Sequence, residues 1–592
     1  MAFPTPHPAT TDLKTLPVPP LDDTLDAYSH ALEAVLDSSE LAHARSVVED
    51  FRTGAGPLLD AKLRERAAER EASGTNWLND EWYSSYLTTR DPLTLTTNVG
   101  FQIALPAAEN TGLDRAVEFI QRAATVHLAA AAGTIEEDVD ARGNRITINQ
   151  WFVYAGGIRH PEKTEDTVIA TDLGAENREI GVFVNGRLFA LPISDANGAI
   201  LPAAALRAGL EKAQHLAAGN PAGLDFNAPS LLGSAALAEL LPTILEQGDN
   251  RATYARLQDM LFTIDLQNGP DTPDTPDSDR IREATFSPRG AWVYKPLSYQ
   301  VGLNSDWIAV HVEHSCQDGA TLVTAITRMQ NANLEVATTT NSAISPTDIS
   351  PTELTWDLDE TTTQNLHEQL DAFNAAAQKL ETDIITVPHN LPADLPFKVS
   401  RDASAQLTMH IAQQLTYGHV RAVYEAVDMR EYRAGRTECL RAATPEAVTF
   451  AEKLIDATAT QTDLQAALEA HRGWVKRCKS GNGFDRHIQM MATIEDPESG
   501  SAGTDAFFTD RLATAARRDF LSTTSIGGPN QIVRYCFAPT LPEGFGISYT
   551  PLPSDAEYCT SWNTDTAEKP AEFRANLTRA SKMLWVFCAD LV

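Results

Sequence analysis

The chain has 592 residues and a mass of 64.4 kDa, too long for one ordinary hydrophobic core, so two large domains or more are expected. Its 43% hydrophobic and 21% charged residues are typical of a globular protein in water. The excess of 80 acidic over 47 basic residues gives a net charge of -33. Such a surface repels phosphate backbones and anionic lipids, which argues against nucleic-acid and membrane partners.

The cysteines and the N-terminus indicate the compartment. Six cysteines are scattered without a CxxC pair, which indicates free thiols in a reducing environment. The opening MAFPTPHPATTDLKTLPVPPL lacks the basic start and apolar core of a signal peptide, and no stretch approaches the ~20 apolar residues of a membrane span. We therefore expect a cytoplasmic protein. A monomer is the expected oligomeric state. No HExxH or comparable ligand spacing occurs, so no metal site is expected.

Helical and strand patterns alternate along the chain. Apolar residues recur at three- and four-residue steps over 21–36 and 41–51, which predicts two amphipathic helices. The segment EIGVFVNGRLFALPI predicts a β-hairpin that turns at Asn185-Gly186. The segment AAALRAGLEKAQHLA, which follows it, predicts a helix. This alternation predicts an α/β protein in two halves, with a mixed sheet in each.

Three stretches read as breaks between these elements. Residues 271–280 (DTPDTPDSDR) and 495–505 (EDPESGSAGTD) predict exposed acidic loops. The Thr-, Ser- and Pro-rich stretch 337–354 is the best candidate for a domain linker.

One strand runs toward a histidine. In WIAVHVEHSCQDGATL, Ile308, Val310 and Val312 alternate with period two, so His314 falls on their face. Asp318-Gly319 then signals a turn. The histidine should therefore lie at the mouth of a strand, where side chains meet solvent or ligand. A structural, hydrogen-bonded histidine is the alternative.

Several further segments accompany this histidine in a fixed order: VYEAVDMREYRAGRTECLR, AHRGWVKRCKSGNGFDRH, FLSTTSIGG and APTLPEGFGISYTPL. With VEHSCQDG and the N-terminal NWLNDEWYSSYLTTRDPL, this ordered set resembles the choline/carnitine acyltransferase family from about residue 14 to about residue 575. The resemblance implies two chloramphenicol-acetyltransferase-like α/β halves, 93–350 and 351–592, with an active-site tunnel between them. It also implies that the helical segment 1–92 packs on the second half.

The resemblance implies direct acyl transfer between the thiol of coenzyme A and the hydroxyl of carnitine. His314 matches the general base, since a neutral imidazole can accept a proton from an alcohol or a thiol near neutral pH. Asp318 matches an orienting carboxylate, with a helix or turn cap as the alternative. Ser525 matches the hydroxyl that stabilises the oxyanion, and Thr524 takes this place in the other register.

The acceptor and the acyl group follow from other matching positions. Family members that act on carnitine hold its carboxylate with an Arg, a Thr and a Tyr, and Arg486, Thr437 and Tyr424 match all three. Thr523 is expected to contact substrate as well. Tyr535 matches a position that is Gly in long-chain enzymes and bulky in acetyl enzymes, which favours a short acyl group.

The match to the coenzyme A site is incomplete. Lys398, Asp402 and Arg472 match family contacts, but Leu391 and Leu395 stand where lysines are expected. Other cations could replace those lysines: Lys476, Arg477 or Lys479. The donor could instead be the phosphopantetheine arm of a carrier protein. Coenzyme A is the preferred donor, because an acidic chain repels the typically acidic carrier proteins.

The leading hypothesis is thus a reversible carnitine O-acyltransferase that needs coenzyme A or acyl-CoA as co-substrate and no permanently bound cofactor. One alternative is an enzyme of the same fold with another acceptor. Another is a non-catalytic protein that binds acyl thioesters. The presence of His314, Arg486 and Ser525 together favours an enzyme.

Overall fold

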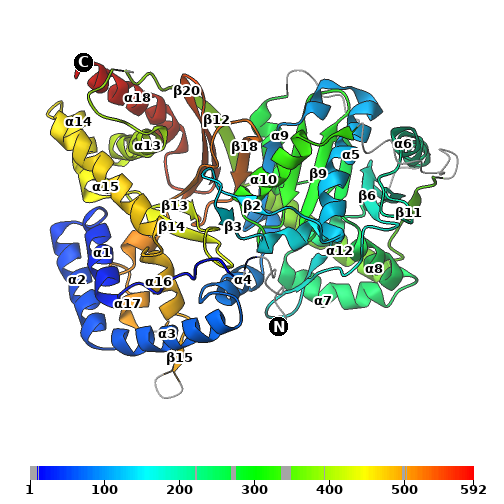
Figure 1. Ribbon diagram of the computed structural model, residues 1–592, viewed down its shortest axis with the longest axis horizontal. Helices are drawn as coiled ribbons and strands as arrows, with labels where there is room; N and C mark the ends of the chain where they lie inside the picture. Colours follow the sequence, from blue (N-terminus) through cyan, green and yellow to red (C-terminus); the bar gives the residue numbers. More distant parts are fainter. Residues whose placement is uncertain are drawn as a thin grey trace.

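The computed structural model places the chain in two lobes side by side, seen at the left and right of Figure 1. It describes residues 10, 12–219, 223–267, 275–334, 349–392, 394–496, 500–501, 503 and 505–592. Within these residues, none of the helices combines the length and apolar character that a bilayer crossing needs.

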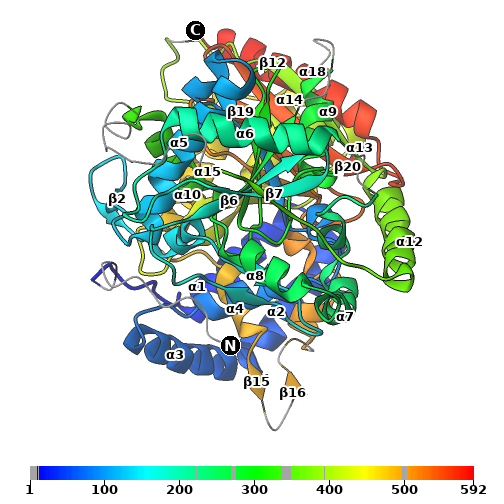
Figure 2. The ribbon, with the colours of Figure 1, turned by 90° about the vertical axis from the view of Figure 1, so that its right-hand side faces the viewer.

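The right-hand lobe, the first half, is built on an eight-stranded mixed sheet. In spatial order its strands are β11 (Thr352–Leu354), β7 (Arg187–Pro192), β6 (Glu179–Val184), β8 (Thr263–Gln267), β9 (Leu297–Gly302), β10 (Ile308–Val312), β1 (Val99–Ile103) and β18 (Ile532–Phe537). Its helices are α5 (Gly112–Ala131), α6 (Ala203–Ala218), α7 (Ser234–Leu245), α8 (Asn250–Asp259), α9 (Asp277–Phe286), α10 (Gly319–Gln330) and α12 (Glu360–Ala377). In Figure 2, α5 and α6 cover the near face of this sheet.

The second half is built on a six-stranded mixed sheet. In spatial order its strands are β12 (Leu380–Pro388), β20 (Asp555–Asn563), β19 (Phe545–Pro551), β17 (Leu521–Thr524), β13 (Val423–Asp428) and β14 (Thr437–Arg441). Its helices are α13 (Arg401–Tyr417), α14 (Pro445–Ile455), α15 (Gln461–Lys479), α16 (Asp485–Met491), α17 (Ala506–Thr509) and α18 (Pro570–Ala589). The predicted fold class, two α/β halves with mixed sheets, is confirmed.

The two halves exchange elements. Strand β18 follows the second half's β17 in sequence but pairs antiparallel with β1, which sets Tyr535 opposite Phe101. Strand β11 pairs with β7, and α12 packs on α7, so both belong to the first half. Helix α9 contacts β1 and β12 and thus joins the two sheets. The predicted division at residue 350 is therefore corrected: the chain enters the second half at Leu380.

The N-terminal helices α1 (Leu21–Glu33), α2 (Ser38–Thr53) and α3 (Gly56–Ala72) pack on the second half, against α14, α17 and α16 (Figure 1). The ring of Tyr28 lies 5.4 Å from Phe484 and 5.7 Å from Phe507, inside that half's core. A capping box at Asp37 explains the start of α2. The two predicted N-terminal helices are confirmed. The next helix, α4 (Asn79–Leu87), reaches the junction between the halves.

Some of the predicted local elements are confirmed and others are corrected. The hairpin β6–β7 is confirmed, with Asn185 and Gly186 both at positive φ. The expected loop 271–280 is corrected in its last four residues: α9 begins at Asp277, because an acidic first turn favours a helix N-terminus. Residues 271–274 lie outside the described residues. The expected loop 495–505 contains a small hairpin, β15 (Glu495–Asp496) with β16 (Gly500–Ser501). Most of the expected linker, 337–348, lies outside the described residues.

Four short strands and several 3-10 turns complete the described elements: β2 (Asp138–Val139), β3 (Arg145–Ile146), β4 (Ile158–His160) and β5 (Thr167–Ile169).

Candidate active site

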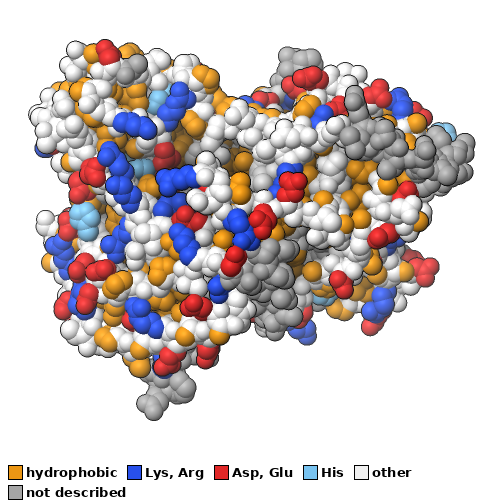
Figure 3. Space-filling view, in the orientation of Figure 1, with side chains coloured by type: hydrophobic (Ala, Val, Ile, Leu, Met, Phe, Trp, Pro, Cys, Tyr) orange, Lys and Arg blue, Asp and Glu red, His pale blue; other side chains and the backbone are white. Residues whose placement is uncertain are grey.

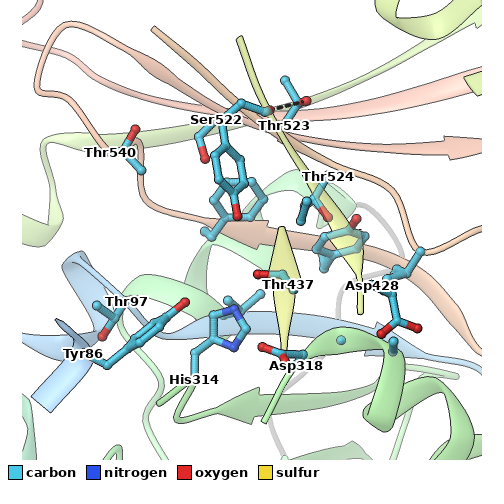
Figure 4. A pocket seen from close by; sticks show the side chains of 18 of the residues that line it. Tyr86, Thr97, His314, Asp318, Asp428, Thr437, Ser522, Thr523, Thr524 and Thr540 are labelled. Atoms are coloured by element: carbon cyan, nitrogen blue, oxygen red, sulfur yellow. Dashed lines mark hydrogen bonds between the residues drawn. The ribbon is translucent and has the colours of Figure 1, made fainter. Parts of the chain in front are cut away.

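A cavity of about 380 Å³ opens between the two halves, and we call it the central cavity. The first half contributes the β1 strand and the segment from His314 to Ala320; the second half contributes β13, β14, α16 and the end of β17. Helix α4 adds Trp82, Ser85 and Tyr86. Figure 4 shows His314 and Asp318 on one side of this space, with Ser522 and Thr524 on the other.

His314 lies two residues past the end of β10 and is half-buried. Its Nδ1 is 2.6 Å from the carbonyl oxygen of Gln317. A carbonyl can only accept a hydrogen bond, so Nδ1 carries a proton, and in the neutral form of the ring the Nε2 lone pair is free. The edge of the ring meets Tyr86 at a centroid distance of 5.5 Å. This arrangement suits a general base.

Asp318 stands at the N-cap of α10, but its side chain makes no capping hydrogen bond. Its carboxylate accepts from Arg436 at 2.7 and 3.0 Å and from Gln150 at 2.8 Å. Burial alone would raise the pKa of Asp318, but the Arg436 charge outweighs burial and lowers it. The carboxylate therefore tethers β14 to the start of α10, and the alternative of a side-chain cap is excluded.

Asp318→Asn should lower the free energy of unfolding by about 3–5 kcal/mol, because it leaves the buried Arg436 guanidinium without its counter-charge. The folded-state pKa of Asp318 lies below its ordinary value of 3.8. The ion pair thus stabilises the fold above that pH, and the stabilisation is lost as the pH falls through the lowered pKa. Urea unfolding at pH 7 checks the cost. Adding Arg436→Met to Asp318→Asn should recover part of the lost free energy of unfolding. No recovery would contradict the ion-pair explanation.

The three residues matched to a carboxylate site meet at the central cavity. Arg486 Nη2 donates to Tyr424 Oη at 3.0 Å and lies 3.4 Å from Thr437 Oγ1. Its Nε donates to the Thr437 carbonyl at 3.1 Å. Burial alone would lower the pKa of Arg486, but Tyr424 and Asp485 outweigh burial and raise it. The structure therefore holds a buried, permanently charged guanidinium beside two hydroxyl groups.

Sequence reasoning missed several side chains around these residues. The ring of Trp82 lies under Arg486, 4.4 Å from the guanidinium carbon. Trp82 and Tyr86 are one turn apart on α4, a spacing that could have marked a shared face. Arg436, the partner of Asp318, immediately precedes Thr437 in the sequence. The glutamine at 150 carried no local signal.

The hydroxyl-rich wall of the central cavity is the end of β17. Thr523 is fully buried and donates to the carbonyl of Tyr424 at 2.7 Å, so its one hydroxyl proton is engaged. Thr524 ends the strand, and Ser525 follows it, half-buried. Both line the cavity. Tyr535 is also a wall residue, and its buried ring stacks on Phe101 at 5.2 Å.

A second cavity of about 330 Å³, the side cavity, shares Ser525 with the central one. Asp402, in the first turn of α13, lines it. Helix α13 begins where the Ser400 hydroxyl accepts from the Ala403 amide at 3.1 Å. Ser525 thus lies where a ligand in the central cavity would meet a ligand in the side cavity.

Cations are sparse near the side cavity. Arg401 lines it, but the guanidinium donates to the carbonyls of Leu552 and Pro553. Burial and Arg401 lower the pKa of His389, which keeps that ring neutral. Asp402 and Asp555 add negative charge. The described lining therefore offers little to a phosphate.

The other positions matched to coenzyme A lie outside both cavities. Lys398 and Arg472 are exposed, and Arg472 pairs with Glu469 at 2.9 Å. Leu391 and Leu395 pack against the core of the second half. The last turn of α15 carries the three alternative cations: Lys476, Arg477 and Lys479. Figure 3 shows Lys and Arg side chains gathered over this half, at the left of the view.

Comparisons with known proteins agree with the sequence resemblance. A family model described as Choline/Carnitine o-acyltransferase matches residues 16–579. Carnitine O-acetyltransferase of Homo sapiens is 25% identical over 589 residues, which cover 94% of this chain and 90% of the relative. Mitochondrial carnitine O-palmitoyltransferase 2 of Bos taurus is 23% identical, covering 91% of this chain and 86% of its own. Choline O-acetyltransferase of Mus musculus is also 23% identical, covering 93% and 88%.

Among solved structures, the wax ester synthase/diacylglycerol acyltransferase from Marinobacter aquaeolei VT8 is 9% identical, with a TM-score of 0.37 over 86% of this chain and 99% of that chain. The family model spans nearly the whole sequence, whereas the relatives differ in acceptor and acyl group. The chain therefore belongs to the choline/carnitine O-acyltransferase family and is an acyltransferase.

Proposed function

We propose that the protein transfers a short acyl group, acetyl first, reversibly between coenzyme A and the hydroxyl of L-carnitine. The observation that carries this proposal is the buried Arg486, bonded to Tyr424 and near Thr437, in the same cavity as His314. A guanidinium fork suits a carboxylate. Carnitine carries a carboxylate beside its hydroxyl, and choline does not.

The proposed mechanism uses one base in both directions. His314 Nε2 accepts the hydroxyl proton of carnitine as the oxygen attacks the thioester carbonyl. The carbonyl oxygen becomes an oxyanion, and Ser525 donates a hydrogen bond to it. When the C–S bond breaks, the thiolate of coenzyme A takes the proton back from the imidazolium. The fixed Nδ1 hydrogen bond to Gln317 keeps Nε2 directed at the cavity.

The proposed donor enters through the side cavity, which shares Ser525 with the central cavity. A cavity of about 330 Å³ suits a slender chain such as the pantetheine arm. Lys398 and the end of α15 are the cations proposed for the phosphate groups outside it.

The decisive assay measures release of free coenzyme A thiol from acetyl-CoA with either L-carnitine or choline. We expect carnitine-dependent release and at least about tenfold lower kcat/KM with choline, since choline cannot engage Arg486. Choline turning over as fast as carnitine would refute the acceptor. If neither L-carnitine nor choline causes release of the thiol, another acceptor or a carrier-protein donor is favoured.

Ser525→Ala should lower kcat about 10²–10³-fold, the usual effect of losing one oxyanion donor. Thr524→Val should lower kcat clearly less than Ser525→Ala does. Single-turnover rates with acetyl-CoA and carnitine compare the two variants. A larger loss in Thr524→Val would transfer the oxyanion role to Thr524.

Tyr535→Gly should extend the acyl pocket, because it removes a ring that is stacked on Phe101 at the cavity wall. We expect the ratio of kcat/KM for octanoyl-CoA to kcat/KM for acetyl-CoA to rise by roughly tenfold or more. The acetyl-CoA rate of the same variant serves as its internal control. An unchanged ratio would mean that another side chain limits acyl length.

A further inference from the structure

A chain of buried polar side chains connects the side cavity to the central cavity. It begins at Asp402 in the lining of the side cavity and ends at Thr523 in the lining of the central cavity. Tyr549, Glu425 and Gln406 lie between them. These residues come from α13, β19, β13 and β17, so the chain crosses the second half behind the hydroxyl-rich wall.

The first links require a shared proton. Tyr549 Oη lies 2.6 Å from Asp402 Oδ1 and 2.6 Å from Glu425 Oε1. A phenol has one proton and cannot donate to two carboxylates, so one carboxyl must itself be protonated. Burial raises the pKa of Glu425, whereas Asp402 is half-buried beside the cavity. Glu425 therefore donates to Tyr549, and Tyr549 donates to Asp402.

The last links reach the residues of the carboxylate site. Gln406 Nε2 donates to Glu425 Oε2 at 3.0 Å and to Thr523 Oγ1 at 2.9 Å. Thr523 in turn donates a hydrogen bond to the carbonyl of Tyr424. The hydroxyl of Tyr424 accepts from Arg486. The hydrogen bonds diverge from Gln406: one branch runs through Glu425 and Tyr549 to Asp402, and the other runs through Thr523 to the carbonyl of Tyr424.

His471 flanks the chain from α15. Its Nε2 is 3.4 Å from Asp402 and 3.8 Å from Glu425. The three side chains could converge on a metal ion. Tyr549 already engages one oxygen of each carboxyl group, and we therefore assign the cluster to the hydrogen-bonded chain.

We propose that Tyr549, Glu425 and Gln406 are positioning residues that couple binding in the side cavity to binding in the central cavity. This inference rests on the proposed function, with the pantetheine arm in the side cavity and carnitine in the central one. An amide N–H of the arm donates to Asp402 and fixes its carboxylate. The hydrogen bonds behind it then hold Tyr424 in place for Arg486. By linkage, each substrate tightens binding of the other by the same factor.

Calorimetric titration of L-carnitine, with and without saturating coenzyme A, measures this factor. We expect coenzyme A to lower the Kd of carnitine at least about fivefold in the wild type, which is the lower end of the usual range of coupling. In Tyr549→Phe and Gln406→Met the factor should fall below about twofold. Tyr558→Phe is the matched control: Tyr558 is opposite Tyr549 on β20 and loses one buried hydrogen bond, to Ala405, outside the chain. It should retain the wild-type factor.

Glu425→Gln tests the relay itself. An amide can donate to Tyr549 and accept from Gln406, as the protonated carboxyl does, so this variant should keep the coupling while Glu425→Leu loses it. If coenzyme A does not change the Kd of carnitine in the wild type, the inference is overturned and the proposed function still stands. Equal losses in Tyr558→Phe and Tyr549→Phe, or loss in Glu425→Gln, would also overturn it. No carnitine binding in the wild type would instead refute the proposed function and the inference with it.

Discussion

His314→Ala should lower kcat at least about 10³-fold and leave the KM for carnitine within a few-fold of wild type. A positioned general base contributes about 10²–10⁴-fold, and the expected loss is near the upper end because one ring serves both proton transfers. The KM should hold because the acceptor is bound by Arg486, which does not contact the His314 ring in any described hydrogen bond. Single-turnover kinetics with acetyl-CoA separate the chemical step from binding.

Two controls make this result specific. His367→Ala removes an exposed histidine on α12 that lines neither cavity, and it should leave kcat unchanged. Added imidazole should restore part of the rate in His314→Ala, since the deleted ring leaves space in the cavity for a free base. A His314→Ala enzyme that retains more than a tenth of wild-type kcat would return His314 to the structural role that most histidines have.

The strand that leads to His314 was predictable because its signals are local. Period-two alternation defines the face of β10, and Asp318-Gly319 marks the point where the chain leaves the sheet. The hairpin at Asn185-Gly186 was predictable for the same reason, since few residues other than Asn and Gly adopt positive φ readily.

Partners distant in sequence were not predictable from such signals. The residues of β18 have a strand pattern, but nothing in that pattern says that the strand crosses to β1 in the other half. Helix α9 was hidden because its acidic first turn resembles a solvated loop. The residues matched to the carboxylate site were found only as an ordered set that resembles a family. That resemblance did not indicate that Gln406 and Tyr549 link the two cavities, because their partners lie on separate elements.

Arg486→Ala should raise the KM for carnitine and lower kcat/KM by about 10²–10³-fold. Loss of one partner from a buried charged pair costs about 2–5 kcal/mol, and the carnitine carboxylate would have to leave water without its counter-charge. Choline turnover, if measurable, should change far less, because choline has no carboxylate to lose. The variant therefore reverses the acceptor preference rather than abolishing chemistry. Steady-state kinetics with both acceptors at saturating acetyl-CoA measure this.

The lysine variant distinguishes charge from geometry. In Arg486→Lys the cation remains, but one ammonium cannot hold Tyr424, the Thr437 carbonyl and a carboxylate in the plane that the guanidinium uses. We expect Arg486→Lys to recover less than a tenth of the lost kcat/KM for carnitine. Full recovery of kcat/KM would show that the site recognises the positive charge alone. Equal losses for carnitine and choline in Arg486→Ala would instead mean that Arg486, stacked on Trp82, supports the cavity wall and not the acceptor.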